Sequence, residues 1–277
     1  MKKVIYILFL LLAIVYNPVK NVYAETGGDI FEKNAYRIVR KIDAEGRISL
    51  TYIFPLNSEI LMENFTEKQY ENYKLYLALY VNSLAKNNEQ KAVSGVNVSG
   101  CVYYEDVDGI GFSVMFDSSK AQQNFFGVSQ NENGEQQKRE TSGLFIKRMS
   151  IEATFPVSSS KVAGDLKMVS ILAISSWSRE NDIELEKKNL LIDALSKAIY
   201  IYDFATTQNS LKSEKMYSEN GFFHNVFTKT ASEIEENNKI VFYVELVDRG
   251  LIYICLIVVV IIGMTIAFII AKRKRKI

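Results

Sequence analysis

Cysteine and histidine are almost absent from this chain of 277 residues. It has two cysteines, Cys101 and Cys255, and one histidine, His224. A zinc centre of the usual His/Cys type needs three or four ligands, so that class of site is excluded. Cys255 lies within a long apolar run, which leaves Cys101 without a disulfide partner in the preceding segment. That segment must therefore be held together by an apolar core.

Motifs of the common enzyme classes are missing as well. The chain has no Gly-rich phosphate loop, no dinucleotide-binding fingerprint and no internal repeat. Two S-x-x-K patterns begin at Ser83 and Ser158, but the S-D-N and K-T-G companions of serine acyl enzymes are absent, so we interpret both as chance matches. His224 is isolated in a predicted strand and is interpreted as structural. The sequence predicts no cofactor and favours a protein that is not an enzyme.

Basic residues are outnumbered between residues 25 and 250. Eight of the 33 Lys and Arg residues lie outside this segment, whereas all 32 Asp and Glu residues lie within it, which gives the segment a net charge of −7. Such a charge is electrostatically unsuited to nucleic acid, so no nucleic-acid partner is expected.

Both ends of the chain carry targeting signals. Residues 1–24 combine Lys2 and Lys3, an apolar run and a small-residue cleavage pattern ending at Ala24, which predicts a secretory signal peptide. Residues 251–271 carry no charge and are long enough to cross a bilayer, and the basic tail 272–277 follows. The sequence thus predicts a single-pass protein of the cell membrane, with its N-terminus outside and its C-terminus in the cytoplasm.

The segment 25–250 is expected to be an extracytoplasmic α+β domain. Alternating apolar residues predict strands at 36–42, 48–54, 93–104, 110–116, 144–155, 199–206, 216–227 and 239–247. The first two are expected to form a hairpin, and the segment 216–227 is expected to turn at Asn220-Gly221. Helical periodicity predicts helices at 66–87 and 182–198, with a short helix after 117. Thr66 and Gln69 have the spacing of a capping box at the start of the first helix. The segment 164–177 is either a helix or a buried strand, of which we favour the helix, while 128–142 is expected to be a loop. We therefore predict antiparallel sheets with two or three packed helices, plus the C-terminal transmembrane helix. A division into two subdomains near 156–164 stays open.

Two groups of residues are candidate binding sites. Glu105, Asp106 and Asp108 form an acidic turn that is a weak candidate for a cation, although the EF-hand pattern fails there. The aromatic side chains offer a possible groove for acyl chains or sugars, since tyrosine combines an apolar face with a polar tip. These groove candidates are Tyr73, Tyr76, Tyr80, Tyr200 and Tyr202. The alternative is that the aromatic residues fill the core.

The order of segments is similar to that of the LppM-like bacterial envelope proteins. The stretch YYEDVDGIGF at 103–112, followed by Phe116 and a short predicted helix, resembles the acidic turn, glycine and strand of that class. This chain lacks the lipobox cysteine that some relatives have. The resemblance implies a non-enzymatic role in binding or handling envelope lipids.

These observations favour a membrane-anchored extracytoplasmic binding or scaffold protein at the cell envelope. Its expected partner is a membrane protein, or a lipid or lipid-linked ligand. The alternative is an envelope hydrolase that uses carboxylates which the sequence does not identify.

Overall fold

The computed structural model describes residues 33–126, 136–141, 146–154, 166–207, 215–237, 239–247 and 249–274. The predicted signal peptide and the possible subdomain boundary at 156–164 lie outside these residues.

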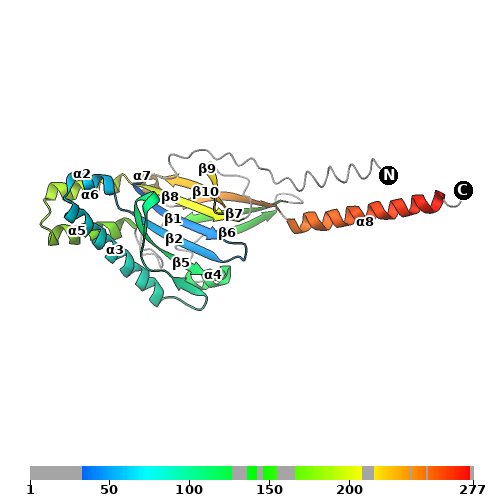
Figure 1. Ribbon diagram of the computed structural model, residues 1–277, viewed down its shortest axis with the longest axis horizontal. Coiled ribbons are helices and arrows are strands. Elements are labelled where there is room, and N and C mark those ends of the chain that lie inside the picture. The colour runs from blue at the N-terminus through cyan, green and yellow to red at the C-terminus, as the bar shows by residue number, and fades with distance from the viewer. Residues whose placement is uncertain are drawn as a thin grey trace.

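An eight-stranded sheet occupies the centre of the molecule (Figure 1). Seven strands follow the order β3-β5-β2-β1-β8-β10-β9, and β4 also pairs with β5. The strands are β1 (Ala35–Ile42), β2 (Ile48–Pro55), β3 (Val96–Val98), β4 (Val102–Tyr104), β5 (Gly109–Phe116), β8 (Ile199–Thr206), β9 (Lys215–Glu219) and β10 (Phe222–Lys229).

The middle of this sheet is a parallel pair, β1 and β8, in which Val39 lies opposite Asp203. The other described pairs of the sheet are antiparallel. The sheet is therefore mixed, which corrects the prediction of antiparallel sheets. A parallel pair requires a crossover connection, and the helices between the two strands in the sequence are part of that connection. Residues on both sides of 156–164 thus belong to the same sheet.

Most of the helices gather beyond one end of the sheet (Figure 1). The helices are α2 (Ser58–Asn64), α3 (Glu67–Gln90), α4 (Ser119–Phe126), α5 (Leu166–Glu180), α6 (Leu185–Ser196) and α7 (Ala231–Glu236), and a 3₁₀ turn covers Glu105–Val107. The predicted capping box of α3 is confirmed: Gln69 N–H donates to Thr66 Oγ1 at 3.3 Å, and Thr66 N–H donates to Gln69 Oε1 at 3.0 Å. The predicted helix at 164–177 is also confirmed, as α5.

Trp177 joins the helices to one another. The indole is fully buried and meets the rings of Phe65 and Tyr73 edge-on, at centroid distances of 5.2 and 5.3 Å. Its Nε1–H donates to the carbonyl oxygen of Gln69 at 3.1 Å, which satisfies the polar atom of an otherwise apolar side chain. The first turn of α3 is thereby fixed against α5.

The large sheet has two chemically different faces because successive side chains of a strand point to opposite sides. One face belongs to the main core, to which β1 contributes Tyr36 and Ile38 and β8 contributes Tyr202 and Phe204. We call the opposite face, which carries Val39, Thr51 and Asp203, the cavity face. The core face is apolar except for the buried residues Arg40 and Asn225, whereas the cavity face mixes apolar, hydroxyl and charged residues.

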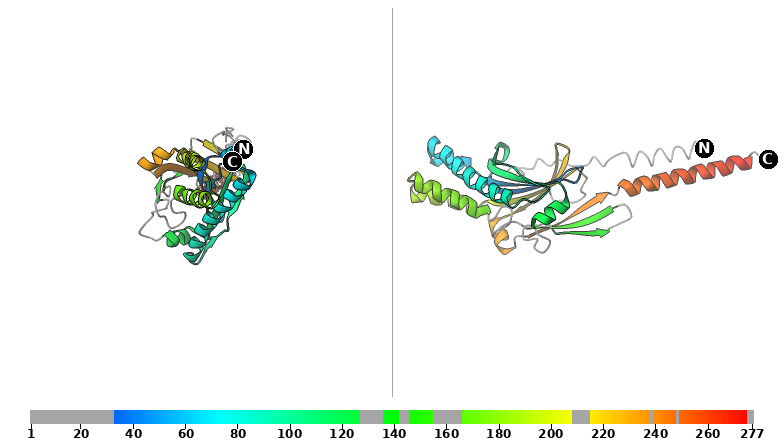
Figure 2. Two further views of the ribbon diagram at one scale, coloured as in Figure 1. Left: turned by 90° about the vertical axis from the view of Figure 1, so that its left-hand side faces the viewer. Right: turned by 90° about the horizontal axis from the view of Figure 1, so that it is seen from below.

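A second sheet of three strands lies as a separate layer (Figure 2). Its order is β11-β7-β6, with β6 at Gln136–Thr141, β7 at Ile146–Thr154 and β11 at Lys239–Val247. The prediction of a loop at 128–142 is wrong for β6, whose sequence QQKRET is entirely polar. Pairing with β7 stabilises this strand despite its composition, because strand formation depends on the neighbours more than on intrinsic propensity.

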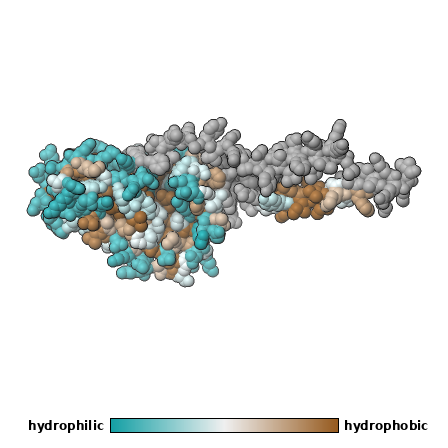
Figure 3. Space-filling view, viewed as in Figure 1, coloured by the Kyte–Doolittle hydropathy of each residue, from teal (hydrophilic) through white to brown (hydrophobic). Residues whose placement is uncertain are grey.

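The segment predicted to cross a membrane forms the helix α8 (Arg249–Lys274), which projects away from the sheets (Figure 1). Its described surface carries exposed apolar side chains such as Ile254, Ile257 and Phe268, and these appear as the brown region of the projecting arm in Figure 3.

Within the described part of the chain, however, no helix has both the length and the apolar character that a membrane crossing requires. The predicted transmembrane helix at 251–271, the single-pass topology and the cell-membrane localisation are therefore contradicted.

The acidic turn after β4 links the large sheet to the helix α2 by hydrogen bonds. Asp108 is buried in a left-handed conformation, with φ of 46°. Its carboxylate accepts hydrogen bonds from Ser58 N–H at 2.8 Å and from Ser58 Oγ at 2.5 Å. Asn57, which precedes α2, makes no side-chain cap of its own. Asp108 thus caps α2 from a distant part of the sequence.

We expect Asp108→Asn to lower the free energy of unfolding by about 1–3 kcal/mol. Asparagine tolerates the left-handed backbone, but its amide nitrogen cannot accept the second hydrogen bond from Ser58. Denaturant titration followed by the fluorescence of Trp177, the chain's only tryptophan, measures the change. Glu105→Gln, at an exposed acid of the same turn, is the matched control and should leave the midpoint unchanged. Equal midpoints for the two variants would refute the capping role of Asp108.

Candidate functional site

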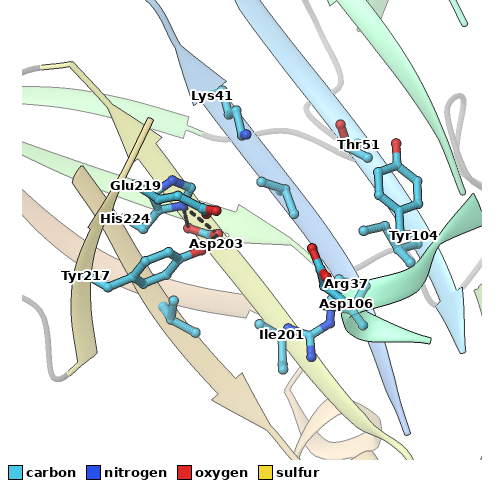
Figure 4. Close-up of a pocket in the computed structure, with 14 residues that line it drawn as sticks. Arg37, Lys41, Thr51, Tyr104, Asp106, Ile201, Asp203, Tyr217, Glu219 and His224 are labelled. Atoms are coloured by element: carbon cyan, nitrogen blue, oxygen red, sulfur yellow. Dashed lines mark hydrogen bonds and ion pairs between the residues drawn. The ribbon is translucent and has the colours of Figure 1, made fainter. Parts of the chain in front are cut away.

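A cavity of about 200 Å³ lies on the cavity face of the large sheet (Figure 4). Its floor comes from the central strands and includes Val39, Ile53 and Ile201. One side is formed by β9 and β10, which contribute Tyr217, Glu219, His224 and Val226. The opposite side is formed by β4 and the 3₁₀ turn, which contribute Tyr104, Asp106 and Val107. Arg37, Lys41, Thr51 and Asp203 complete the lining.

Alternation along β1 places two cations in the cavity. Arg37, Val39 and Lys41 are separated by two residues each, so all three point to the cavity face. The backbone distance from Arg37 to Lys41 is about 13 Å at about 3.3 Å per residue. The Nζ atom of Lys41 lies 5.6 Å from the centre of the Phe222 ring, a cation–π contact. The cations therefore stand at two separate positions along the cavity.

Asp203 is the centre of a buried polar network. Its carboxylate accepts hydrogen bonds from Tyr217 Oη at 3.1 Å and lies 2.8 Å from His224 Nδ1. The rings of Tyr217 and His224 stack with their centroids 4.3 Å apart. Asp203 and His224 are only 6% and 2% exposed, so a carboxylate here requires these partners. The three side chains come from the neighbouring strands β8, β9 and β10, as Figure 4 shows.

The network keeps Tyr217 protonated and orients the ring of His224. Burial is the main cause that raises the pKa of Tyr217 above its ordinary value, and the Asp203 carboxylate adds to the effect. Tyr217 therefore stays a neutral phenol and a hydrogen-bond donor. The position of His224 Nδ1 against a carboxylate assigns the proton of the neutral ring to Nδ1, which leaves Nε2 as an acceptor. Among the described residues Nε2 has no hydrogen-bond partner, and His224 lines the cavity.

The far side of the cavity depends on a glycine. A Cβ atom at Gly111 would lie 2.2 Å from the carbonyl oxygen of Tyr52 and 3.1 Å from Cε2 of Tyr104. The absence of a side chain at Gly111 thus allows the Tyr104 ring to approach β5. On the adjoining strands, Thr51 Oγ1 and Ser113 Oγ are hydrogen-bonded at 2.7 Å.

The structure separates the three acidic residues of the predicted cation site. Asp106 lines the cavity, Glu105 is exposed, and Asp108 is occupied by its bonds to Ser58. Within the described ranges, no group of three or more His, Cys, Asp or Glu residues is arranged to hold a metal ion. Of the three, only Asp106 is placed where it can meet a ligand in this cavity.

The five tyrosines of the predicted groove lie in two different places: three are in the core, and two are at the contact between α3 and α5. Tyr73, Tyr200 and Tyr202 are buried in the core, and Tyr200 stacks on Tyr36. Tyr76 Oη donates to Glu180, and Tyr80 Oη lies 2.6 Å from Ser176 Oγ, so these two join α3 to α5. None of the five lines the cavity, and a role for them in ligand binding stays a prediction.

Sequence analysis missed most of the cavity residues. Arg37, Lys41, Asp203 and Tyr217 were not singled out, and His224 was considered alone. A signal was available in β8, where Asp203 is the single charged residue in the apolar run IYIYDFAT. An acid in such a run needs a buried partner, and the chain's only histidine was the natural candidate.

Comparison with known proteins gives little evidence of relatives. No protein-family model matches it, and no curated protein does. Among solved structures, it has a weak resemblance to the folded domain of LppM from Mycobacterium tuberculosis, determined by NMR. The alignment has 12% sequence identity and covers 78% of this chain and 92% of that domain, with a TM-score of 0.30.

Proposed function

We propose that this chain is a binding protein whose cavity on the large sheet holds a small polar ligand. The observation that carries the proposal is that a concave site is lined by a histidine of fixed orientation: His224 lines the cavity, and Asp203 holds its Nδ1 atom. Ligand sites typically combine an apolar lining with a few well-placed polar groups, as this cavity does.

The rest of the lining agrees with such a role. Val39, Ile201 and Val226 provide apolar surface, and Ile201 and Val226 belong to a small apolar cluster that stiffens this part of the sheet. The polar groups stand on strands and on one short turn, so their positions are set by backbone hydrogen bonds. A rigid site of this kind loses little conformational entropy when a ligand binds.

Substitution of Val39 by tryptophan should abolish ligand binding. Val39 lies on the cavity floor and is only partly buried, so the larger ring fills the cavity without entering the core. Ser49→Trp is the matched control, since Ser49 is a partly buried residue of the same sheet face and does not line the cavity.

The measurement is saturation-transfer NMR with a panel of monosaccharides, amino acids, acetate and inorganic phosphate. At least one probe should bind to the unmodified chain and to Ser49→Trp, and its signal should fall at least tenfold with Val39→Trp. Binding that is equal in the two variants, or no binding of any probe, would overturn the proposal.

Hydrolysis is the second candidate function, and the Asp203–His224 pair favours it. A histidine held by a carboxylate through Nδ1, with Nε2 facing a cavity, is the arrangement of a general base. No serine or cysteine is among the described residues that line the cavity, and the hydroxyl of Thr51 is hydrogen-bonded to Ser113 Oγ, so water is the expected nucleophile. Cys101 is not a substitute, since burial raises the pKa of its thiol to about 11.

Turnover measurements separate the two candidates. If the chain only binds its ligand, p-nitrophenyl esters and p-nitrophenyl phosphate should be hydrolysed no faster by the unmodified chain than by His224→Gln. A rate that falls about 10²–10⁴-fold in His224→Gln but not in Glu105→Gln would replace the binding role by that of a hydrolase.

A further inference from the structure

The charges around the cavity are mixed rather than of one sign. Arg37 and Lys41 are cationic, and Asp106, Asp203 and Glu219 are anionic. Figure 4 shows Asp106 on the side of Tyr104 and Glu219 on the side of the Asp203–His224 pair, while Arg37 and Lys41 belong to β1 between them. An anion in this cavity would meet three carboxylates, and a cation would meet two basic groups. The arrangement favours a ligand without net charge.

Hydrogen-bonding groups of both kinds face the same space. Asp106, Glu219 and Nε2 of the neutral His224 ring can accept hydrogen bonds, whereas Lys41 and the Tyr104 hydroxyl can donate them. A ligand that satisfies this set must itself both donate and accept at several positions. Hydroxyl groups do both, and an uncharged compound with several hydroxyls matches the set better than a carboxylate, a phosphate or an amine.

The size and the surface of the cavity point to a compact ring. A volume of about 200 Å³ is several times the roughly 30 Å³ that one water molecule occupies in the liquid. Tyr104 supplies an aromatic ring at one side, and Val39 and Ile201 supply an apolar floor. The C–H face of a sugar ring suits such surfaces, while its hydroxyl groups reach the surrounding polar groups.

We infer that the cavity binds an uncharged sugar ring, with His224 Nε2 accepting a hydrogen bond from one sugar hydroxyl and Glu219 and Asp106 accepting from others. The inference rests on the proposed binding function and specifies its ligand class. Asp203 acts as a positioning residue, because it holds the proton of His224 on Nδ1 and thereby keeps Nε2 an acceptor.

The effect of neutralising the two free carboxylates separates a sugar from an anion. In the variant Asp106→Asn with Glu219→Gln, a sugar loses two charged acceptors and should bind at least fivefold more weakly. An anion is freed from two repulsive charges and should bind more tightly. Asp106 and Glu219 are both exposed, so the variant should fold normally, and Glu105→Gln is the matched control.

The experiment measures the dissociation constants of glucose, galactose, mannose and N-acetylglucosamine, and of inorganic phosphate and acetate, by NMR titration. The inference is supported if at least one sugar binds more tightly than both anions and is weakened by the double variant but not by Glu105→Gln. It is overturned if an anion binds best and the double variant strengthens it, while the proposed binding function survives that result. If no probe distinguishes Val39→Trp from Ser49→Trp, both proposals fail together.

Discussion

The parallel pairing of β1 with β8 is the constraint on which the rest of the structure depends. It brings residues 35–42 beside residues 199–206 and thereby joins the two halves of the large sheet. The same register sets Val39 opposite Asp203, Arg37 opposite Ile201 and Lys41 opposite Ala205, so the two cations of β1 lie on either side of the position that faces the acid of β8. Without this pair, the core face would lack its two central strands, and the cavity would lack Val39 and Ile201 on its floor.

The sequence predicts best what depends on neighbouring residues. The hairpin of β1 and β2, the capping box at Thr66 and the turn of β9 and β10 all follow from local patterns, and the structure confirms them. That last turn has positive φ at Asn220 and Gly221, as a two-residue hairpin loop requires. The helix α2 was missed because its cap is Asp108, which is 50 residues away in the sequence. Local patterns carry no information about such a partner.

The candidate site was harder to predict for the same reason. Tyr217, His224 and Asp203 belong to three strands whose order in the sheet is not written in any one segment. Of the residues that the sequence suggests as binding candidates, Asp106 alone lines the cavity, and it is there because β4 and the 3₁₀ turn lie over Gly111. The tyrosines were candidates because aromatic residues are frequent in this chain. Frequency does not distinguish a core ring such as Tyr73 from a cavity ring such as Tyr104. A buried acid in an apolar strand is a more specific signal than a frequent residue type.

The hydrogen bonds of Asp203 stabilise the sheet, and the same bonds position a polar group at the cavity. A carboxylate with so little exposure would be costly without hydrogen-bond donors, and both donors come from the edge hairpin of β9 and β10. The bonds that satisfy Asp203 therefore also hold that hairpin against β8. The hydrogen bond from Nδ1 of His224 to the carboxylate sets the orientation of the ring, and in the neutral ring it leaves Nε2 as an acceptor. The interaction that stabilises the edge of the sheet is thus the one that presents an acceptor to the cavity.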